Sequence, residues 1–254
     1  MTEQTTPGSG KYPSAKSQDP TLDDHTIYAP ATPPAGVKLP VLIWGNGGCA
    51  NDPTQFGNLL KEIASHGYLV LANGAPAKGF SLFGKQSSIK QMTAGIDWVL
   101  AGKGSKYGDI DTAHIATAGQ SCGGLQAYST AYHDDRVKQI MIFNSGLLDD
   151  GKVPLLAEIK VPVSYFLGGP KDIAYSNGEA DWKDINQKLP SLKLNLDTGH
   201  MGTYSAKDGG KFGVAAVKFL DAVFKGDATA KAAFCGPDAA LVKEHWKIDQ
   251  RNWC

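Results

Sequence analysis

Residues 114–124 read HIATAGQSCGG, and this stretch is the strongest indication of the fold in the sequence. The run 114–118 predicts a buried strand, and the residues after the stretch predict a helix that leaves it directly. Between them, residues 119–123 fit the pattern G-x-S-x-G, in which Ser121 stands on a tight strand-to-helix turn. Such a turn holds a serine hydroxyl out of the sheet, where it is accessible as a nucleophile. The alternative is an ordinary turn between a strand and a helix.

Apolar runs and helical patterns alternate along the rest of the chain, which is typical of parallel strands joined by crossover helices. Further strands are predicted at 39–44, 68–72, 137–144, 161–167 and 192–196, with a long loop at 73–87. Helices are predicted from Asp52 as N-cap and Pro53 as first helical residue to Gly67, then at about 88–100, 174–188 and 214–224. We predict an α/β fold with a mostly parallel central sheet and helices on both faces. A single domain is expected at 25–254, including a C-terminal tail, after a loose segment at 1–24.

Charge and hydropathy argue against two classes of partner. Lys plus Arg and Asp plus Glu both number 25, so no net charge attracts a phosphate backbone or an anionic bilayer. No stretch approaches the roughly 18 consecutive apolar residues of a membrane span, and residues 1–24 lack the apolar core of a signal peptide. We expect no nucleic-acid partner, no membrane span and a monomer.

The chain has four cysteines, an even number that can pair completely in an oxidising compartment. Cys235 and Cys254 bracket the C-terminal tail, where a disulfide would hold residues that otherwise fray. A secreted protein with this bridge is one interpretation. The other is a cytoplasmic enzyme with two unrelated thiols.

A serine nucleophile needs a histidine base, and the base needs a carboxylate that fixes its tautomer. Of six histidines, His200 alone follows the last predicted strand in a loop, DTGHMG at 197–202. Asp172 follows the strand at 161–167 through GGPK, at the end of the sheet where ligands bind in α/β folds. Asp149 and Asp150, one strand earlier, are the rival acids. With Asp172 as the acid, the three candidate catalytic residues occur along the chain in the order Ser, Asp, His.

An acyl-transfer transition state also needs donors for the developing oxyanion, usually two backbone amides. The amide of Cys122 qualifies because it opens the helix after the nucleophile. The loop after the strand at 39–44 reads GNGG, and we assign the second donor to the amide of Asn46. The alternative is a glycine-rich turn required only for tight packing.

These motifs together resemble the α/β-hydrolase superfamily from about Pro40 to Phe224. Within it, the chain is similar to the dienelactone-hydrolase-related and cutinase-like polyester hydrolase branch, which includes secreted fungal and bacterial esterases. The resemblance rests on WGNGG at 44–48, GQSCGG at 119–124, GGPKD at 168–172 and Gly199-His200. Dienelactone hydrolases proper have cysteine at the nucleophile position, where this chain has Ser121. If the fold is as expected, Cys49 and Cys122 lie close together, either as a disulfide that rigidifies the oxyanion loop or as small apolar fillers.

The sequence therefore predicts a serine hydrolase that cleaves carboxylic esters through an acyl-enzyme, with catalytic Ser121, Asp172 and His200. The resemblance extends the expected substrates from small esters to polyester or cutin-like polymers. An acyltransferase or peptidase on the same fold, and a catalytically silent binding protein, are the alternatives. No H-E-x-x-H, C-x-x-C or EF-hand motif is present, so we expect no metal and no cofactor.

Overall fold

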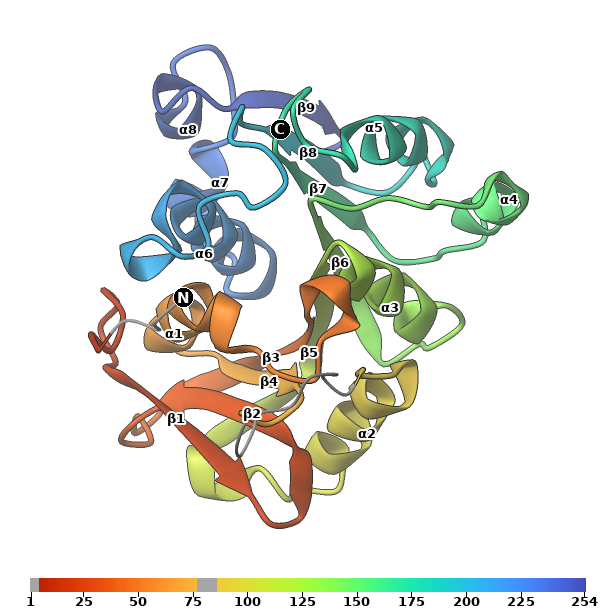
Figure 1. Cartoon of the computed structure of the whole chain (residues 1–254). Helices are drawn as coiled ribbons and strands as arrows, with labels where there is room; N and C mark the ends of the chain where they lie inside the picture. The colour runs from red at the N-terminus through yellow and green to blue at the C-terminus, as the bar shows by residue number, and fades with distance from the viewer. Residues whose placement is uncertain (1–4, 77–85) are drawn as a thin grey trace.

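A nine-stranded sheet runs through the computed structural model, which describes residues 5–76 and 86–254 (Figure 1). Its strands are β1 (Ser14–Asp19), β2 (Leu22–Pro30), β3 (Lys38–Gly45), β4 (Leu69–Asn73), β5 (Asp109–Gln120), β6 (Val137–Phe143), β7 (Val163–Leu167), β8 (Ser191–Asn195) and β9 (Lys247–Arg251). They lie in the order β1-β2-β4-β3-β5-β6-β7-β8-β9. The six strands from β4 to β8 in this order pair in parallel, whereas β1, β2 and β9 pair antiparallel at the two edges. The carboxyl ends of the parallel strands therefore meet at one edge of the sheet.

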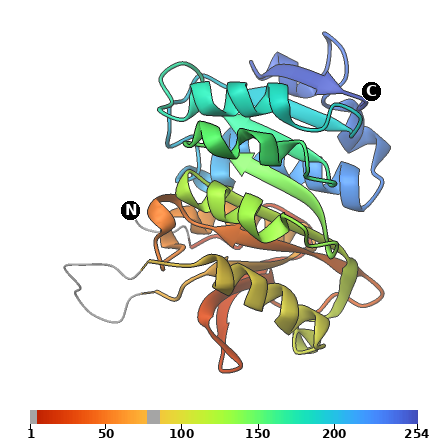
Figure 2. The ribbon, with the colours of Figure 1, turned by 90° about the vertical axis from the view of Figure 1, so that its right-hand side faces the viewer.

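Helices cover both faces of this sheet, as predicted. They are α1 (Gly57–Ser65), α2 (Ile89–Leu100), α3 (Cys122–Ala131), α4 (Val153–Leu156), α5 (Tyr175–Asp184), α6 (Gly210–Phe224), α7 (Ala228–Ala232) and α8 (Ala240–Lys243). Helices α1 and α6 lie on the left of the sheet in Figure 1, and α2, α3 and α5 lie on the right. Figure 2, which views the right-hand side, shows α2, α3 and α5 in front of the sheet. The α/β class is thus confirmed.

The two faces of the sheet hold separate apolar clusters. In β3, Leu42 and Trp44 face the cluster of α1 and α6, while Val41 and Ile43 face the cluster of α2 and α3. Alternate side chains of a strand point to opposite faces, so a parallel strand buried on both sides is apolar at most positions. This explains why the continuous runs in the sequence predicted the central strands.

The N-terminal segment departs from the prediction. Residues 1–24 were expected to be loose, but Ser14–Asp19 forms strand β1 and pairs with β2. Its residues are polar and its burial is low because it lies at the edge of the sheet, where one side of the ladder has no neighbouring strand. Composition therefore gave no signal for this strand. The expectation of a loose segment is wrong from Ser14 onward.

The first helix also begins later than predicted. Asp52 accepts hydrogen bonds from the amide and hydroxyl of Thr54 at 2.9 and 2.6 Å, but Thr54 begins a short 3-10 turn, Thr54–Phe56, with Pro53 as its N-cap residue. Helix α1 starts only at Gly57. By contrast, α2 begins where expected, because Ser88 and Gln91 form a capping box. Residues 77–85 of the predicted loop 73–87 lie outside the described residues.

The C-terminal tail is attached to the sheet by covalent and aromatic contacts. Cys235 and Cys254 form a disulfide, which is one of the two alternatives that the sequence left open. Trp253 stacks on Phe219 of α6 with ring centroids 5.3 Å apart, and β9 extends the sheet beside β8.

In the two described ranges, none of the helices combines the length and apolar character that a membrane crossing requires.

Between α3 and α5, a carboxyl group is buried with two tyrosines. The hydroxyls of Tyr128 and Tyr165 lie 2.6 Å apart, and Tyr128 donates to Asp181 Oδ2 at 3.0 Å. The amide of Leu147 donates to the same oxygen at 2.9 Å. Burial raises the pKa of Asp181 to about 6, against the opposing effect of these hydrogen bonds.

This raised pKa predicts a stability that depends on pH. Between pH 4 and 6 the folded state holds the Asp181 proton more tightly than the unfolded chain does, so the free energy of unfolding falls as pH rises through this range. Asp181→Asn stays neutral and still accepts both hydrogen bonds. We expect this variant to be more stable than the wild type above pH 6, by up to about 3 kcal/mol, and the difference to vanish below pH 4.

Chemical denaturation at pH 4, 6 and 8 measures the difference. Asp135→Asn, which replaces an exposed carboxyl, is the matched control and should follow the wild type at each pH. An Asp181→Asn variant that is less stable than the wild type at pH 8 would contradict the expectation.

Candidate active site

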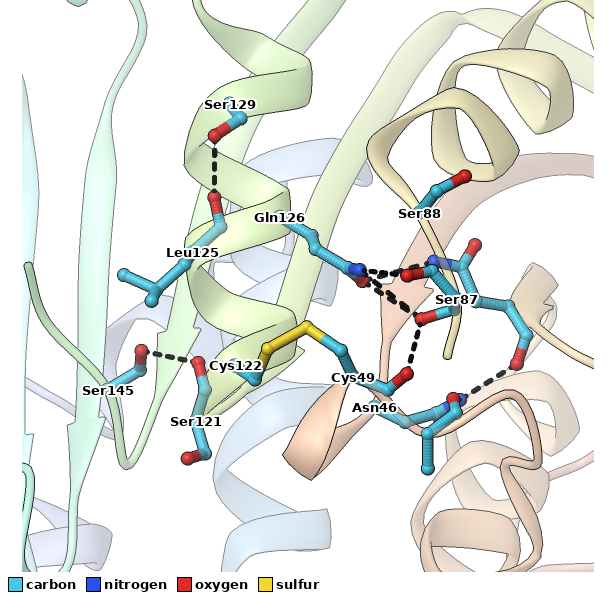
Figure 3. Close-up of a disulfide and its surroundings, with 12 residues drawn as sticks. Asn46, Cys49, Ser87, Ser88, Ser121, Cys122, Leu125, Gln126, Ser129 and Ser145 are labelled. Atoms are coloured by element: carbon cyan, nitrogen blue, oxygen red, sulfur yellow. Dashed lines mark hydrogen bonds between the residues drawn. A yellow bond between two sulfur atoms is a disulfide. The ribbon is translucent and has the colours of Figure 1, made fainter. Parts of the chain in front are cut away.

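Ser121 lies between β5 and α3 in a strained backbone conformation, with φ 53° and ψ −121°. A residue with a side chain rarely adopts a positive φ, and such strain concentrates at functional sites. The amide of Ser121 donates to Phe143 O at 3.0 Å, and Ser145 Oγ donates to Ser121 O at 2.7 Å, a contact drawn in Figure 3. The end of β6 and a residue just after it therefore hold the amide and the carbonyl of Ser121 in place.

Glycines make this turn sterically feasible. A Cβ on Gly119 would overlap the carbonyl of Gly123, and a Cβ on Gly123 would overlap the carbonyl of Gly45 at the end of β3. The glycines of the G-x-S-x-G pattern are thus needed for close packing of backbone on backbone. This packing brings the first turn of α3 against the loop that follows β3.

Asp172 and His200 form a hydrogen-bonded pair at the same edge of the sheet. Asp172 Oδ1 lies 2.6 Å from His200 Nδ1, and the carboxylate is fully buried while the imidazole is 20% exposed. Because a carboxylate only accepts, His200 Nδ1 carries the proton and Nε2 has the free lone pair. The rival acids are elsewhere, since Asp149 caps a 3-10 turn and both Asp149 and Asp150 are exposed.

The buried carboxylate of Asp172 accepts three further hydrogen bonds. Its donors are the amide of Gly168 at 3.1 Å, the amide of Ala174 at 2.9 Å and Asn144 Nδ2 at 2.7 Å. A buried negative charge is costly unless it is hydrogen-bonded, and here both oxygens are engaged. The carboxylate is therefore held in one position toward the imidazole.

The loop of His200 contacts the turn of Ser121 through Gln120. Gln120 Nε2 donates to the carbonyl oxygen of His200 at 2.9 Å, and Gln120 directly precedes Ser121. Among the described residues, no hydrogen bond joins Ser121 Oγ to the imidazole of His200. The structure thus brings Asp172 and His200 into contact and sets the His200 loop beside the turn of Ser121. Catalytic hydrogen bonds often form only with substrate bound.

The two amides predicted as oxyanion donors lie near each other. Cys122 is the first residue of α3, and the first amides of a helix have no acceptor within the helix. A Cβ on the next residue, Gly123, would lie 2.6 Å from the amide nitrogen of Asn46, so this amide is beside the same helical turn. The side chain of Asn46 is buried and donates to Ala50 O and Asn73 O, each at 2.8 Å. These bonds fix the loop that carries the amide.

A disulfide between Cys49 and Cys122 joins the loop after β3 to the residue after Ser121 (Figure 3). The carbonyl of Cys49 also accepts from the amide of Ser87 at 2.7 Å and from its hydroxyl at 3.1 Å. Gln126 of α3 donates in turn to the carbonyl of Ser87 at 3.0 Å. The bridge was one of two alternatives from the sequence, and the other, a pair of apolar fillers, is excluded.

Three polar residues of this region were not predicted from the sequence. Asn144 and Tyr204 are buried next to Asp172, and Gln120 is buried behind Ser121. The only sequence signal was for Asn144, a polar residue directly after the apolar run that ends β6 and thus at the edge where Asp172 was expected.

In residues 5–76 and 86–254, no group of three or more His, Cys, Asp or Glu side chains is arranged to hold a metal ion.

Comparison with known proteins adds no identification. No protein-family model matches the chain, and no curated protein is significantly similar to it. The chemistry of this site therefore has to be argued from its geometry.

The Cys49–Cys122 disulfide predicts a local effect on the loop at 46–50. A double Cys49→Ala/Cys122→Ala variant removes a cross-link over 73 residues, which is worth about 4 kcal/mol in the loop-entropy model. We expect amides 46–50 to exchange hydrogen faster in this variant than in the wild type, as measured by mass spectrometry. The matched control is the double variant Cys235→Ala/Cys254→Ala. Its free energy of unfolding should fall by about 3 kcal/mol, while hydrogen exchange of amides 46–50 should stay as in the wild type. Equal exchange in both variants would refute a role of the bridge in this loop.

Proposed function

We propose that this protein is a serine hydrolase that cleaves carboxylic esters through an acyl-enzyme. Ser121 is the nucleophile, His200 the general base and Asp172 the residue that orients the base. The observation that carries the proposal is the buried 2.6 Å hydrogen bond of Asp172 to His200 on the loop beside the strained turn of Ser121. A serine on such a turn, followed along the chain by an acid and a histidine, is the arrangement of serine hydrolases with an α/β fold.

The first half of the reaction acylates the serine. His200 Nε2 takes the proton of Ser121 Oγ while this oxygen forms a bond to the ester carbonyl carbon, and the carbonyl oxygen becomes an oxyanion. The amides of Asn46 and Cys122 donate to that oxyanion. When the intermediate collapses, the bond from carbon to the alcohol oxygen breaks, and the alcohol leaves with the proton from His200. Asp172 stabilises the imidazolium that forms in between.

The second half releases the acid. A water molecule gives a proton to His200 Nε2 as its oxygen attacks the acyl carbon, and the same two amides hold the new oxyanion. The bond from carbon to Ser121 Oγ then breaks, and His200 returns its proton to that oxygen. The carboxylic acid leaves, and the enzyme is regenerated without any net change in its own groups.

The family assignment is part of the proposal. We infer membership of the α/β-hydrolase superfamily, in the dienelactone-hydrolase-related and cutinase-like branch, with small esters and polyesters as the substrate range. A mostly parallel sheet with helices on both faces, and a loop after β3 that sets the amide of Asn46 beside the first turn of α3, support it. Two disulfides fit an oxidising compartment, and we propose that the protein acts outside the cell.

A fluorophosphonate probe tests the proposal directly, because it reacts only with a serine that a base has activated. We expect the probe to modify Ser121 in the wild type, as located by peptide mass spectrometry, and p-nitrophenyl esters to be hydrolysed. Ser121→Ala should abolish labelling and lower kcat at least about a thousandfold. The matched control is Ser129→Ala, which removes an exposed serine of α3, the helix that follows Ser121. This variant should keep wild-type labelling.

The opposite results are equally informative. Labelling that survives Ser121→Ala would place the nucleophile elsewhere. A wild type that is neither labelled nor active on any ester of a graded acyl-length panel would contradict the proposal and favour a silent binding protein. Faster transfer to an added alcohol or amine than to water would instead indicate an acyltransferase.

A further inference from the structure

Asn144 occupies a buried position that the proposed reaction does not use. It directly follows β6 and adopts a positive φ of 42°. Its backbone N–H donates to Phe166 O at 2.8 Å. Its side chain lies so close to the next strand end that a Cβ on Gly168 would come within 2.6 Å of Asn144 Nδ2. The residue is fully buried, at the edge of the sheet where Ser121, Asp172 and the His200 loop meet.

The side chain of Asn144 contacts Asp172 and the residue that directly precedes His200. Asn144 Nδ2 donates to Asp172 Oδ2 at 2.7 Å and to the carbonyl oxygen of Gly199 at 3.2 Å. Its Oδ1 accepts from the hydroxyl of Tyr204. One amide group therefore links the carboxylate to the backbone beside His200, and a tyrosine farther along the same loop holds its other end.

Hydrogen-bond chemistry fixes the orientation of this amide. A carboxylate oxygen and a carbonyl oxygen are both pure acceptors, so the group facing Asp172 and Gly199 has to be the NH₂. The oxygen of Asn144 is then left to accept from Tyr204. Burial, and next the negative charge of Asp172, raise the pKa of Tyr204 well above its ordinary value, so the phenol keeps its proton and donates.

We propose that Asn144, oriented by Tyr204, is the positioning residue that holds Asp172 and the His200 loop in register with Ser121. The inference rests on the proposed function. Asn144 fixes the carbonyl of Gly199, and Gln120 fixes the next carbonyl, that of His200. Two side-chain amides from adjacent strand ends thus restrain consecutive peptide units of the histidine loop, while within the described part of the chain the imidazole itself hydrogen-bonds only to Asp172.

Removing the side-chain amide of Asn144 should lower kcat more than it weakens substrate binding. We expect Asn144→Ala to lower kcat on a p-nitrophenyl ester by about 10- to 100-fold with little change in KM, because a small displacement of the base acts on the transition state. The rate of fluorophosphonate labelling should fall by a similar factor. Steady-state kinetics and timed labelling on the folded variant measure both.

Tyr204→Phe is the second variant, because it keeps the aromatic packing and removes only the donor to Asn144. Without this hydrogen bond the Oδ1 end of Asn144 is no longer held, so its NH₂ is placed less precisely against Asp172 and Gly199, and we expect kcat to fall by about 10-fold. Tyr68→Phe is the matched control. Tyr68 is also buried and donates to a carboxylate, Asp221 Oδ1 at 2.7 Å, but between β4 and α6. This control should keep the wild-type kcat.

A charge substitution separates positioning from a purely structural role. Asn144→Asp sets a second carboxylate against Asp172, with His200 and Tyr204 as the other titratable neighbours. Two buried carboxyls in contact share one proton, so the variant gains a titrating pair that the wild type lacks, and the kcat/KM profile should acquire an additional pH-dependent step. A residue that only supports the fold would lower stability and leave the profile in place.

The outcomes of the two proposals are distinguishable. A wild type that reacts with the probe, combined with wild-type kcat in both Asn144→Ala and Tyr204→Phe, would overturn the role of Asn144 and leave the esterase proposal standing. If Asn144→Ala does not fold, Tyr204→Phe against Tyr68→Phe decides alone. A wild type that is neither labelled nor active would overturn both proposals.

Discussion

Three glycines meet where β3 and β5 end, and no side chain fits between them. A Cβ on Gly45 would lie 2.7 Å from the carbonyl oxygen of Gly123, and Cβ atoms on Gly119 or Gly123 would overlap backbone. This contact lets the chain turn from β5 into α3 with Ser121 at positive φ, and it presses the loop of Asn46 against the first turn of that helix. The Cys49–Cys122 disulfide then makes the same contact covalent.

The second half of the site depends on a buried charge that is fully hydrogen-bonded. Asp172 lies in an apolar sheet edge, and two backbone amides, Asn144 and His200 satisfy its oxygens. Such a carboxylate has little freedom, so the imidazole paired with it has little freedom either. Preorganisation of this kind is what acyl transfer requires, because donors and base need not rearrange as charge develops.

Sequence patterns were sufficient for the centre of the fold and for residues on strand ends. The central strands are rich in apolar residues because both faces of the sheet are covered, and Asp172 and His200 each follow such a strand. Strands β1 and β9 were missed because they lie at the two edges of the sheet, where exposure leaves them polar and irregular in pattern. The contacts of Asn144 with Asp172 and Tyr204 join residues 28 and 60 positions apart, and no local pattern encodes them.

We infer that Ser121 and the Asp172–His200 pair act as one catalytic unit. A crystal structure of the protein after reaction with a small fluorophosphonate would show whether they do. We expect phosphorus bonded to Ser121 Oγ, the phosphoryl oxygen on the amides of Asn46 and Cys122, and His200 Nε2 within hydrogen-bonding distance of the modified oxygen. An adduct with the imidazole turned away from Ser121, or with the phosphoryl oxygen on other donors, would contradict it.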